Sequence, residues 1–304
     1  SIKGDASFRK FYRNKKNNSI IVFSNKEKNK NLLIYDAVNK ILIKNKILAP
    51  KLINQNYSNN FIEIQDLGNN TIHQLLEKKK ISKNLIFKKI IAVLNKIQLI
   101  KDKKIKNFNN KLFKIKKYNK KILYEEAKIF CDWYVPTKLS KKKCIKFNYE
   151  FKKEVKILLS NLNYKNDTFV HRDFHISNLM YYKKKIGIID TQDAVIGNKA
   201  YDLASFIDDV RFKTSNKFKE QVYNYYLKKN KQVKLNKFKT DFEILSVLRN
   251  FKIIGIFVRL GERDNKKKYL KLIPYAWKMI EYRANKNKIF NNLIILLKKN
   301  SLSY

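Results

Sequence analysis

The feature that most constrains this chain is a polar loop between two short apolar runs. The loop covers residues 170–180 and contains His171-Arg172-Asp173, with Asn178 near its end. A second apolar run follows at 185–189 and ends at Asp190. Both runs contain β-branched residues, which predicts a strand on each side of the loop. The pattern therefore predicts a strand–loop–strand unit that gathers several polar side chains.

The spacing of three of these side chains indicates phosphoryl transfer. Asp173 and Asn178 stand five positions apart, the separation found in the His-Arg-Asp-x-x-x-x-Asn loop of kinases. In that loop the aspartate accepts the proton of the acceptor hydroxyl, and the asparagine binds magnesium. Asp190 closes the second run, and a second metal ligand is expected at such a strand end. We therefore predict Asp173 as the catalytic base and Asn178 and Asp190 as metal ligands.

The same loop also has a purely structural explanation. Aspartate and asparagine in loops often make turn hydrogen bonds, and a degenerate, inactive kinase fold would keep the same outline. The catalytic interpretation is favoured because the spacing, the two strands and the second aspartate occur together. His171 and His175 are interpreted as structural, because a metal site needs more nitrogen or sulfur ligands than this loop offers. His175 as a general base is the weaker alternative, since Asp173 already fills that role.

Length and composition limit the class of protein. With 304 residues, 44% of them hydrophobic, the chain can form one large domain or two modest ones around a packed core. It has no apolar run of about 18 residues, and its N-terminus lacks the apolar region of a secretory signal. The two cysteines, Cys131 and Cys144, lack the spacing of a metal site. We expect a cytoplasmic protein without a membrane span.

The formal net charge of +44 comes from 69 Lys and Arg against 25 Asp and Glu. Such an excess is typical of proteins that bind nucleic acid or anionic membranes. Here the excess is mostly lysine and is spread along the whole chain beside abundant Asn and Ile. These three residues have AT-rich codons, which favours a biased genome as the explanation. No specific nucleic acid partner is expected, and a nonenzymatic polyanion-binding protein is a distant alternative. In either case the positive field should attract ATP and other anions, less so at high salt.

The N-terminal segment has the order of elements of a kinase N-lobe. Strands are predicted at 19–23 and 61–65, with a helix at 29–46 between them. Asp66-Leu67-Gly68 then breaks the second strand, as a hinge would. Adenine would bind the backbone near Gln65 to Leu67. Before these elements, residues such as Gly4 and Ser7 predict a small-residue turn whose N–H groups can face phosphate oxygens.

Beyond the hinge the pattern is mainly helical. Thr71 and Gln74 can form a capping box at a helix start. Apolar periodicity predicts three longer helices: one capped by Ser82, one at 148–162, and one at 241–259 that residues 261–264 interrupt. Their apolar stripes are interpreted as core.

One segment of this region, residues 124–136, is both acidic and aromatic. A sugar site needs an apolar ring face for the C–H side of the pyranose and carboxylates for its hydroxyls. The segment offers both. A buried aromatic helix end explains the same composition equally well, so both interpretations stay open here.

Together these motifs resemble the aminoglycoside phosphotransferase and choline kinase superfamily. Within it, the chain looks most like the bacterial N-acetylmuramate/N-acetylglucosamine anomeric kinases of cell-wall recycling. The matching motifs lie at residues 4–9, 66–68, 130–134, 171–180, 190–203 and 255–264. The superfamily is indicated by the catalytic loop together with Asp-x-x-x-Ala-x-x-Gly from Asp190 to Gly197. The subfamily rests on Gln192-Asp193-Ala194 and on Trp133-Tyr134.

The resemblance implies an α+β, bilobal protein-kinase-like fold, with a small β-rich N-lobe at 1–68 and a larger, mostly helical C-lobe at 69–304. It implies an ATP- and Mg²⁺-dependent kinase that acts on a small-molecule sugar, most of all on the anomeric hydroxyl of N-acetylmuramate or N-acetylglucosamine. The implied residues are the base Asp173, the metal ligands Asn178 and Asp190, the nucleotide-binding Ser7, Phe8, Arg9, Gln65, Asp66 and Leu67, and the sugar-pocket residues Glu126, Trp133 and Gln192.

One position departs from the broad kinase pattern. Phe23 stands on the second strand where a phosphate-pairing lysine is usual, so Lys26 or Lys28 would have to replace that lysine. The anomeric sugar kinases that the chain resembles also lack a lysine there, and the sequence assigns no residue to the phosphate clamp.

Three other kinases are weighed as rivals. An aminoglycoside kinase needs an acidic pocket, which the charge of +44 disfavours. A choline kinase needs an aromatic cage, which Trp133, Tyr134 and Trp277 would supply if they converge. A protein kinase is disfavoured, because the segment from Asp190 to Asp202 is too short for a regulated activation loop.

Overall fold

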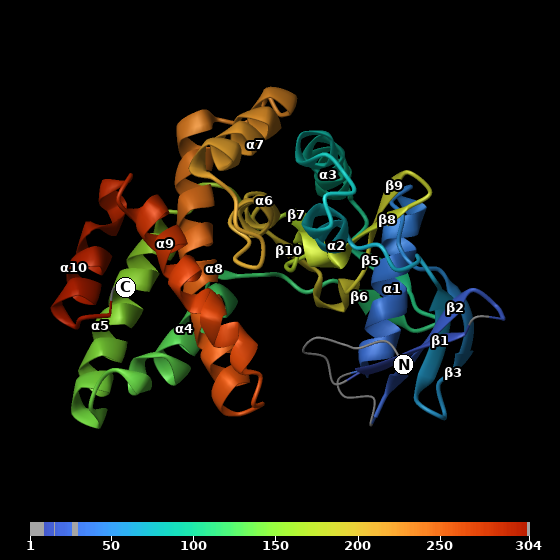
Figure 1. The fold of residues 1–304 in the computed structure, drawn as a ribbon, viewed down its shortest axis with the longest axis horizontal. Helices are drawn as coiled ribbons and strands as arrows, with labels where there is room; N and C mark the ends of the chain where they lie inside the picture. Colours follow the sequence, from blue (N-terminus) through green and yellow to red (C-terminus); the bar gives the residue numbers. More distant parts are fainter. Residues whose placement is uncertain (1–8, 15, 26–29, 303–304) are drawn as a thin grey trace. The chain divides into compact units, whose positions relative to one another are not determined.

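The structure is a computed structural model that describes residues 9–14, 16–25 and 30–302. The chain forms two compact units. Unit 1 holds residues 1–117 and 168–196, and unit 2 holds residues 118–167 and 197–304. Figure 1 shows the order of the elements along the chain. The boundary between an N-lobe at 1–68 and a C-lobe at 69–304 stays a prediction.

Unit 1 contains a four-stranded antiparallel sheet with the strand order β1-β2-β4-β3. Its strands are β1 (Arg9–Asn14), β2 (Ser19–Ser24), β3 (Leu52–Asn56) and β4 (Phe61–Gln65). The predicted strands at 19–23 and 61–65 are confirmed as β2 and β4. The helix predicted at 29–46 is confirmed as α1 (Asn31–Lys44).

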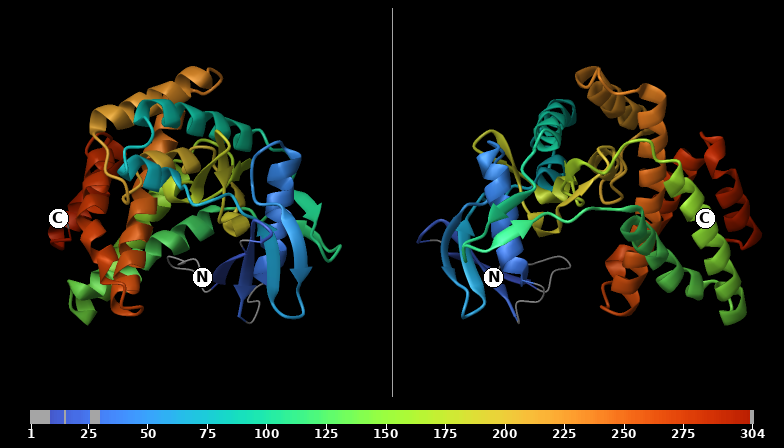
Figure 2. Two further views of the ribbon diagram at one scale, coloured as in Figure 1. Left: turned by 45° about the vertical axis from the view of Figure 1, so that its right-hand side comes forward. Right: turned by 180° about the vertical axis from the view of Figure 1, so that it is seen from behind.

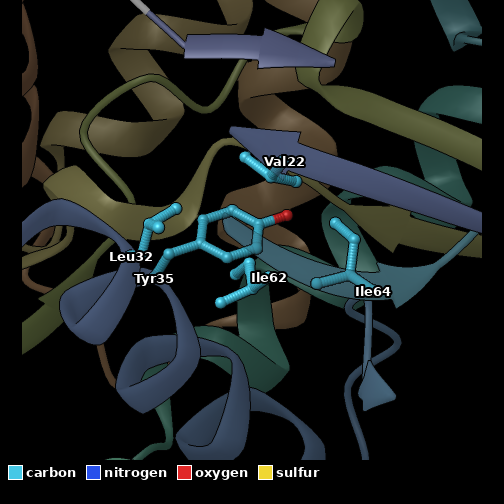
Figure 3. Packing of buried hydrophobic residues seen from close by; sticks show 5 residues of the cluster. All are labelled: Val22, Leu32, Tyr35, Ile62 and Ile64. Atoms are coloured by element: carbon cyan, nitrogen blue, oxygen red, sulfur yellow. The ribbon is translucent and has the colours of Figure 1, made fainter. Parts of the chain in front are cut away.

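The sheet and α1 share a small apolar core. Val22 of β2 pairs with Ile62 of β4, and side chains alternate along a strand, so Ile64 lies on the same face as Ile62. These three side chains pack against Leu32 and Tyr35 of α1 (Figure 3). All five are at most 5% exposed. Because a fully buried aliphatic side chain contributes about 1.5–3 kcal/mol, this contact fixes α1 against the sheet.

The rest of unit 1 carries helices and two-stranded ribbons. The helices are α2 (Ile72–Glu77) and α3 (Lys83–Gln98). The ribbons pair β5 (Lys104–Lys106) with β6 (Leu112–Lys114), β7 (Thr168–Val170) with β10 (Val195–Gly197), and β8 (Leu179–Tyr182) with β9 (Lys185–Ile188). The capping box of Thr71 and Gln74 is present at the start of α2. Ser82 precedes α3 as predicted but makes no side-chain cap bond.

Unit 2 is helical. Its helices are α4 (Lys120–Trp133), α5 (Lys141–Ser160), α6 (Tyr201–Ile207), α7 (Asn216–Lys229), α8 (Leu235–Glu262), α9 (Ile273–Ala284) and α10 (Asn291–Lys299). Helix α8 packs against α4, α6 and α9, and α5 packs against α10 (Figure 2). No helix among the described residues combines the length and apolarity that a membrane crossing requires.

Three predicted helix boundaries in unit 2 were wrong. The helix predicted at 241–259 begins earlier, at Leu235, as α8. The helix predicted at 148–162 begins earlier, at Lys141, because its first turns are rich in lysine and carry little apolar periodicity. The predicted interruption at 261–264 begins only after Glu262, since α8 continues through Gly261. A Cβ on Gly261 would lie 2.7 Å from Cδ2 of Leu270, so this glycine serves close packing and does not end the helix.

At Gly255, α8 passes close to the backbone of α4. A Cβ there would lie 2.3 Å from the backbone oxygen of Ile129. Although alanine is the better helix former by about 1 kcal/mol, Gly255→Ala should destabilise the protein by about 3 kcal/mol, because the backbone of α4 has to move. Denaturant unfolding measures the effect. Gly261→Ala is the matched control, since only the flexible Leu270 side chain has to yield; equal effects of the two changes would contradict the explanation.

Candidate active site

The predicted catalytic loop lies in unit 1 between β7 and β8 and closes on itself. The backbone oxygen of Asp173 accepts hydrogen bonds from the N–H of His175 and from Nδ2 of Asn178, both at 3.0 Å. Arg172 has φ 79°, a left-handed conformation that non-glycine residues rarely adopt. Such strained backbone is concentrated at functional sites. The two bonds thus hold Asp173 and Asn178 together in one rigid turn.

Asp190 lies beside Asn178 because β8 and β9 pair. Leu179 is opposite Ile188 in this ribbon, and the N–H of Ile189 donates to the backbone oxygen of Asn178 at 3.1 Å. Asp190 follows directly and has φ 63°, again left-handed, which turns the chain at the end of β9. The structure therefore connects the three residues predicted as base and metal ligands through adjacent backbone.

Each of the two predicted metal ligands has one polar atom engaged and one oxygen open. Nδ2 of Asn178 donates to Asp173, whereas its Oδ1 accepts no hydrogen bond from the described residues. Oδ1 of Asp190 accepts from Arg9 and Gln192, whereas its Oδ2 accepts none from them. The Asp190 side chain is 40% exposed. Magnesium is usually held by one or two carboxylates plus phosphate and water oxygens, so this donor set fits magnesium.

Both histidines of the loop are buried in its packing. His171 is 1% exposed, and its Nε2 lies 3.0 Å from the backbone oxygen of Ile189. His175 is 6% exposed, with its Nε2 3.4 Å from Nδ2 of Asn178. These contacts agree with the structural role predicted for both residues.

Helix α1 is tied to the turn after Asp190 by a residue that the sequence analysis missed. Thr191 Oγ1 donates to Oδ1 of Asn39 at 2.6 Å, and Nδ2 of Asn39 donates to the backbone oxygen of Pro50 at 3.1 Å. Asn39 and Thr191 are both buried, and buried polar groups are normally paired in this way. The available signal was an asparagine on the otherwise apolar face of a helix.

Arg9, the first residue of β1, is buried against the same turn. Its guanidinium donates to Oδ1 of Asp190 at 2.5 Å and to Oε1 of Gln192 at 2.9 Å. Its Cζ lies 5.5 Å and 5.7 Å from the ring centres of Phe11 and Tyr35. Burial raises the pKa of Tyr35 to about 12, against the opposing charge of Arg9. The side chain of Arg9 is only 4% exposed.

Four residues predicted to bind or pair phosphate lie outside the described residues, and the structure adds nothing about them. They are Ser7, Phe8, Lys26 and Lys28.

The predicted hinge is held by its own hydrogen bonds. The Asp66 carboxylate accepts from Arg13 and from the N–H of Gly68, the latter at 2.7 Å. The N–H groups of Gln65 and Asp66 donate to Lys51 and Asn18. The N–H of Leu67 donates to no described residue. The Asp66 side chain therefore shapes the turn, and one backbone donor is left for a ligand.

The predicted sugar residue Glu126 lies on α4 in a buried network of unit 2. Oε2 of Glu126 accepts from the hydroxyl of Tyr118 and is 2.9 Å from Nζ of Lys252. The Tyr118 hydroxyl also lies 3.1 Å from that of Tyr201, and burial raises the pKa of Tyr201. Glu126 is 8% exposed. The partners Tyr118 and Lys252 gave no signal in the sequence.

The other predicted sugar residues lie in different surroundings. Trp133 is the half-buried last residue of α4 in unit 2. Its neighbour Tyr134 stacks on Phe130, and Trp277 packs against both of these rings, inside the core. Gln192 belongs to unit 1, beside Asp190. The sugar-binding roles of Glu126, Trp133 and Gln192 stay predictions.

Comparison with known proteins identifies the family. Residues 1–235 match the model of the phosphotransferase enzyme family. The chain belongs to this family. It is therefore a kinase that transfers phosphate to a hydroxyl acceptor, and the predicted resemblance is confirmed.

Curated relatives and solved structures agree. The chain is 26% identical over 280 residues to an N-acetylmuramate/N-acetylglucosamine kinase of Neisseria meningitidis, covering 89% of this chain and 80% of that one. It is 25% identical to the Pseudomonas aeruginosa enzyme of the same name, covering 91% and 81%. Among solved structures, a choline/ethanolamine kinase family protein of Mesorhizobium loti has a TM-score of 0.65 at 8% identity, covering 96% and 90%. An ADP-bound aminoglycoside phosphotransferase has a TM-score of 0.59 at 16% identity, covering 92% of each chain. These structures confirm the predicted protein-kinase-like fold.

Proposed function

We propose that this kinase uses ATP and magnesium to phosphorylate a sugar, namely the anomeric hydroxyl of N-acetylmuramate or N-acetylglucosamine. The observation that carries the proposal is the closed turn of Asp173 and Asn178 beside Asp190, with one open oxygen on each predicted metal ligand. The substrate follows from the curated relatives, whose names specify these two amino sugars.

In the proposed reaction Asp173, Asn178 and Asp190 have separate roles. The carboxylate of Asp173 orients the acceptor hydroxyl and accepts its proton. Oδ1 of Asn178 and Oδ2 of Asp190 would hold magnesium, which neutralises charge on the transferred phosphoryl group when it is bound. An anomeric hydroxyl is more acidic than an ordinary alcohol, so Asp173 needs to accept the proton only late.

The adenine of ATP is assigned to the hinge. The N–H of Leu67, which donates to no described residue, is a donor for a ring nitrogen beside the turn that Arg13 and Asp66 fix. Arg13 also donates to the backbone oxygen of Gly68 at 3.2 Å. Two residues of opposite charge thus make the hinge rigid before nucleotide binds, which reduces the ordering cost of binding.

A choline acceptor is disfavoured by the aromatic residues considered for its cage. Tyr134 and Trp277 do converge, with ring centres 5.7 Å apart. They are, however, 6% and 1% exposed, so their faces pack on protein. A quaternary ammonium group needs open ring faces.

A panel of acceptors tests the proposal directly. N-acetylmuramate, N-acetylglucosamine, kanamycin and choline are each incubated with the protein, ATP and Mg²⁺, and phosphorylated products are identified by mass spectrometry and ³¹P NMR. We expect phosphate on the anomeric oxygen of the two amino sugars, visible as loss of their reducing end. Phosphorylation of kanamycin or choline alone would overturn the proposed substrate, and no ATP turnover with any acceptor would overturn the reaction.

A further inference from the structure

We infer that Arg9 and Gln192 are positioning residues that hold the Asp190 carboxylate by Oδ1 and thereby present Oδ2 to the metal. The inference rests on the proposed role of Asp190 as a magnesium ligand. It assigns to Arg9 and Gln192 roles that differ from those the sequence predicted, which were phosphate contact and sugar contact.

The three side chains form a closed cycle of hydrogen bonds. Arg9 donates to Asp190 at 2.5 Å and to Gln192 at 2.9 Å, and Nε2 of Gln192 donates to the same Oδ1 of Asp190 at 3.1 Å. Two donors on one oxygen fix the rotation of the carboxylate. The second oxygen accepts from no described residue, on a side chain that is 40% exposed. Ligating carboxylates are commonly held this way by hydrogen-bonding partners outside the coordination sphere.

Contacts outside the cycle hold both Arg9 and Gln192 in place. Side chains alternate along β1, so Arg9 and Phe11 share the face toward the core while Lys10 points away and is exposed. Arg9 lies near the rings of both Phe11 and Tyr35, which stiffens its long side chain. At the other end, Nε2 of Gln192 donates to Asp193 at 2.9 Å.

Geometry separates this role from direct phosphate contact. Both terminal nitrogens of Arg9 donate to protein, one to Asp190 and one to Gln192, and the side chain is 4% exposed. A guanidinium that binds phosphate directs its fork of terminal nitrogens at the ligand. In Arg9 the fork is directed at a carboxylate and an amide instead, so its effect on the nucleotide passes through Asp190.

The test uses two changes that keep the charge and remove the cycle. Arg9→Lys loses the paired guanidinium nitrogens, and Gln192→Leu loses the three hydrogen bonds of the Gln192 amide. For each variant, the dissociation constant of ATP is measured by calorimetry with EDTA and with excess Mg²⁺. The dissociation constant with EDTA divided by that with Mg²⁺ gives the affinity that the metal adds. Loss of an outer-sphere partner typically weakens metal binding by about 10–100-fold, so this ratio should fall at least about tenfold, with the EDTA constant nearly unchanged.

Lys10→Arg is the matched control, a charge-conserving exchange at the next residue on the opposite face of β1, and it should keep the wild-type ratio. Melting temperatures and the EDTA constant show that the variants are folded. An unchanged ratio in both variants would overturn the inference. An equal loss of ATP affinity with and without metal in Arg9→Lys would also overturn the inference, because this result would mean that the guanidinium contacts the phosphates directly. If the wild-type protein binds no ATP, the proposed function itself fails.

Discussion

Replacing Asp173 by asparagine is expected to lower kcat by about 10²–10⁴-fold, the usual contribution of a general base. The backbone oxygen of Asp173, not its side chain, accepts the two bonds that close the loop. The side-chain change therefore removes the proton acceptor and leaves the turn intact. ATP affinity and melting temperature should stay at wild-type values, and steady-state kinetics with the preferred sugar measures the loss.

Asp102→Asn is the control for loss of a carboxylate from unit 1. Asp102 pairs with Lys44 and Asn45 at the end of α1 and bonds to none of the described residues of the catalytic loop, so kcat should not change. His175→Gln separates the two candidate bases. If the histidine variant lost as much activity as Asp173→Asn with its fold intact, the base would be His175 and the proposed mechanism would be wrong.

The sequence predicted the elements whose local pattern is strong. Strands β2 and β4 and helix α1 alternate or repeat apolar residues clearly, and their limits were predicted to within about two residues. Strand β3 was not predicted, because Leu52–Asn56 is polar and mostly exposed at the sheet edge. It forms only because β4 offers it a backbone partner.

The same distinction between local patterns and long-range contacts applies to the candidate site. The spacing of Asp173 and Asn178 reflects one turn of chain, so it is visible in the sequence. The bond from Arg9 to Asp190 spans 181 positions and that from Thr191 to Asn39 spans 152, and no local pattern encodes either. The sequence showed that Arg9 and Gln192 were of interest, but only the fold brings them to one carboxylate.

The largest expected effect on stability is at Asp208, which connects four helices of unit 2. Its carboxylate follows α6 and accepts from Ser246 of α8 at 2.6 Å and from Arg283 of α9 at 2.8 Å and 3.0 Å. Nζ of Lys219 on α7 lies 3.4 Å away. Asp208→Asn leaves two buried cations without their counter-charge. Breaking a buried ion pair in this way costs about 3–5 kcal/mol, which denaturant unfolding near neutral pH measures.

Glu220→Gln is the matched control. Glu220 also pairs with a lysine, Lys286, at 3.1 Å, but both side chains are nearly half exposed. Exposed pairs contribute about 0–1 kcal/mol, so this variant should unfold close to the wild type. Equal losses in the two variants would show that Asp208 owes its effect to something other than buried charge.

The pH dependence of the Asp208 effect follows from its pKa. Burial alone would raise this pKa, but the charges of Arg283 and Lys219 and the hydrogen bonds from Arg283 and Ser246 outweigh it and lower the pKa from 3.8 to about 2. Because this pKa is lower in the folded than in the unfolded protein, the ionised carboxylate stabilises the folded state fully at pH values above the unfolded-state pKa. That contribution is lost as the pH falls toward 2, and a shift of this size is worth about 2 kcal/mol. Asp208→Asn has no such proton to bind. The stability difference between wild type and variant should therefore shrink by about 1 kcal/mol between pH 6 and pH 3, and a difference that stays constant or grows would mean that the carboxylate is not ionised in the folded protein.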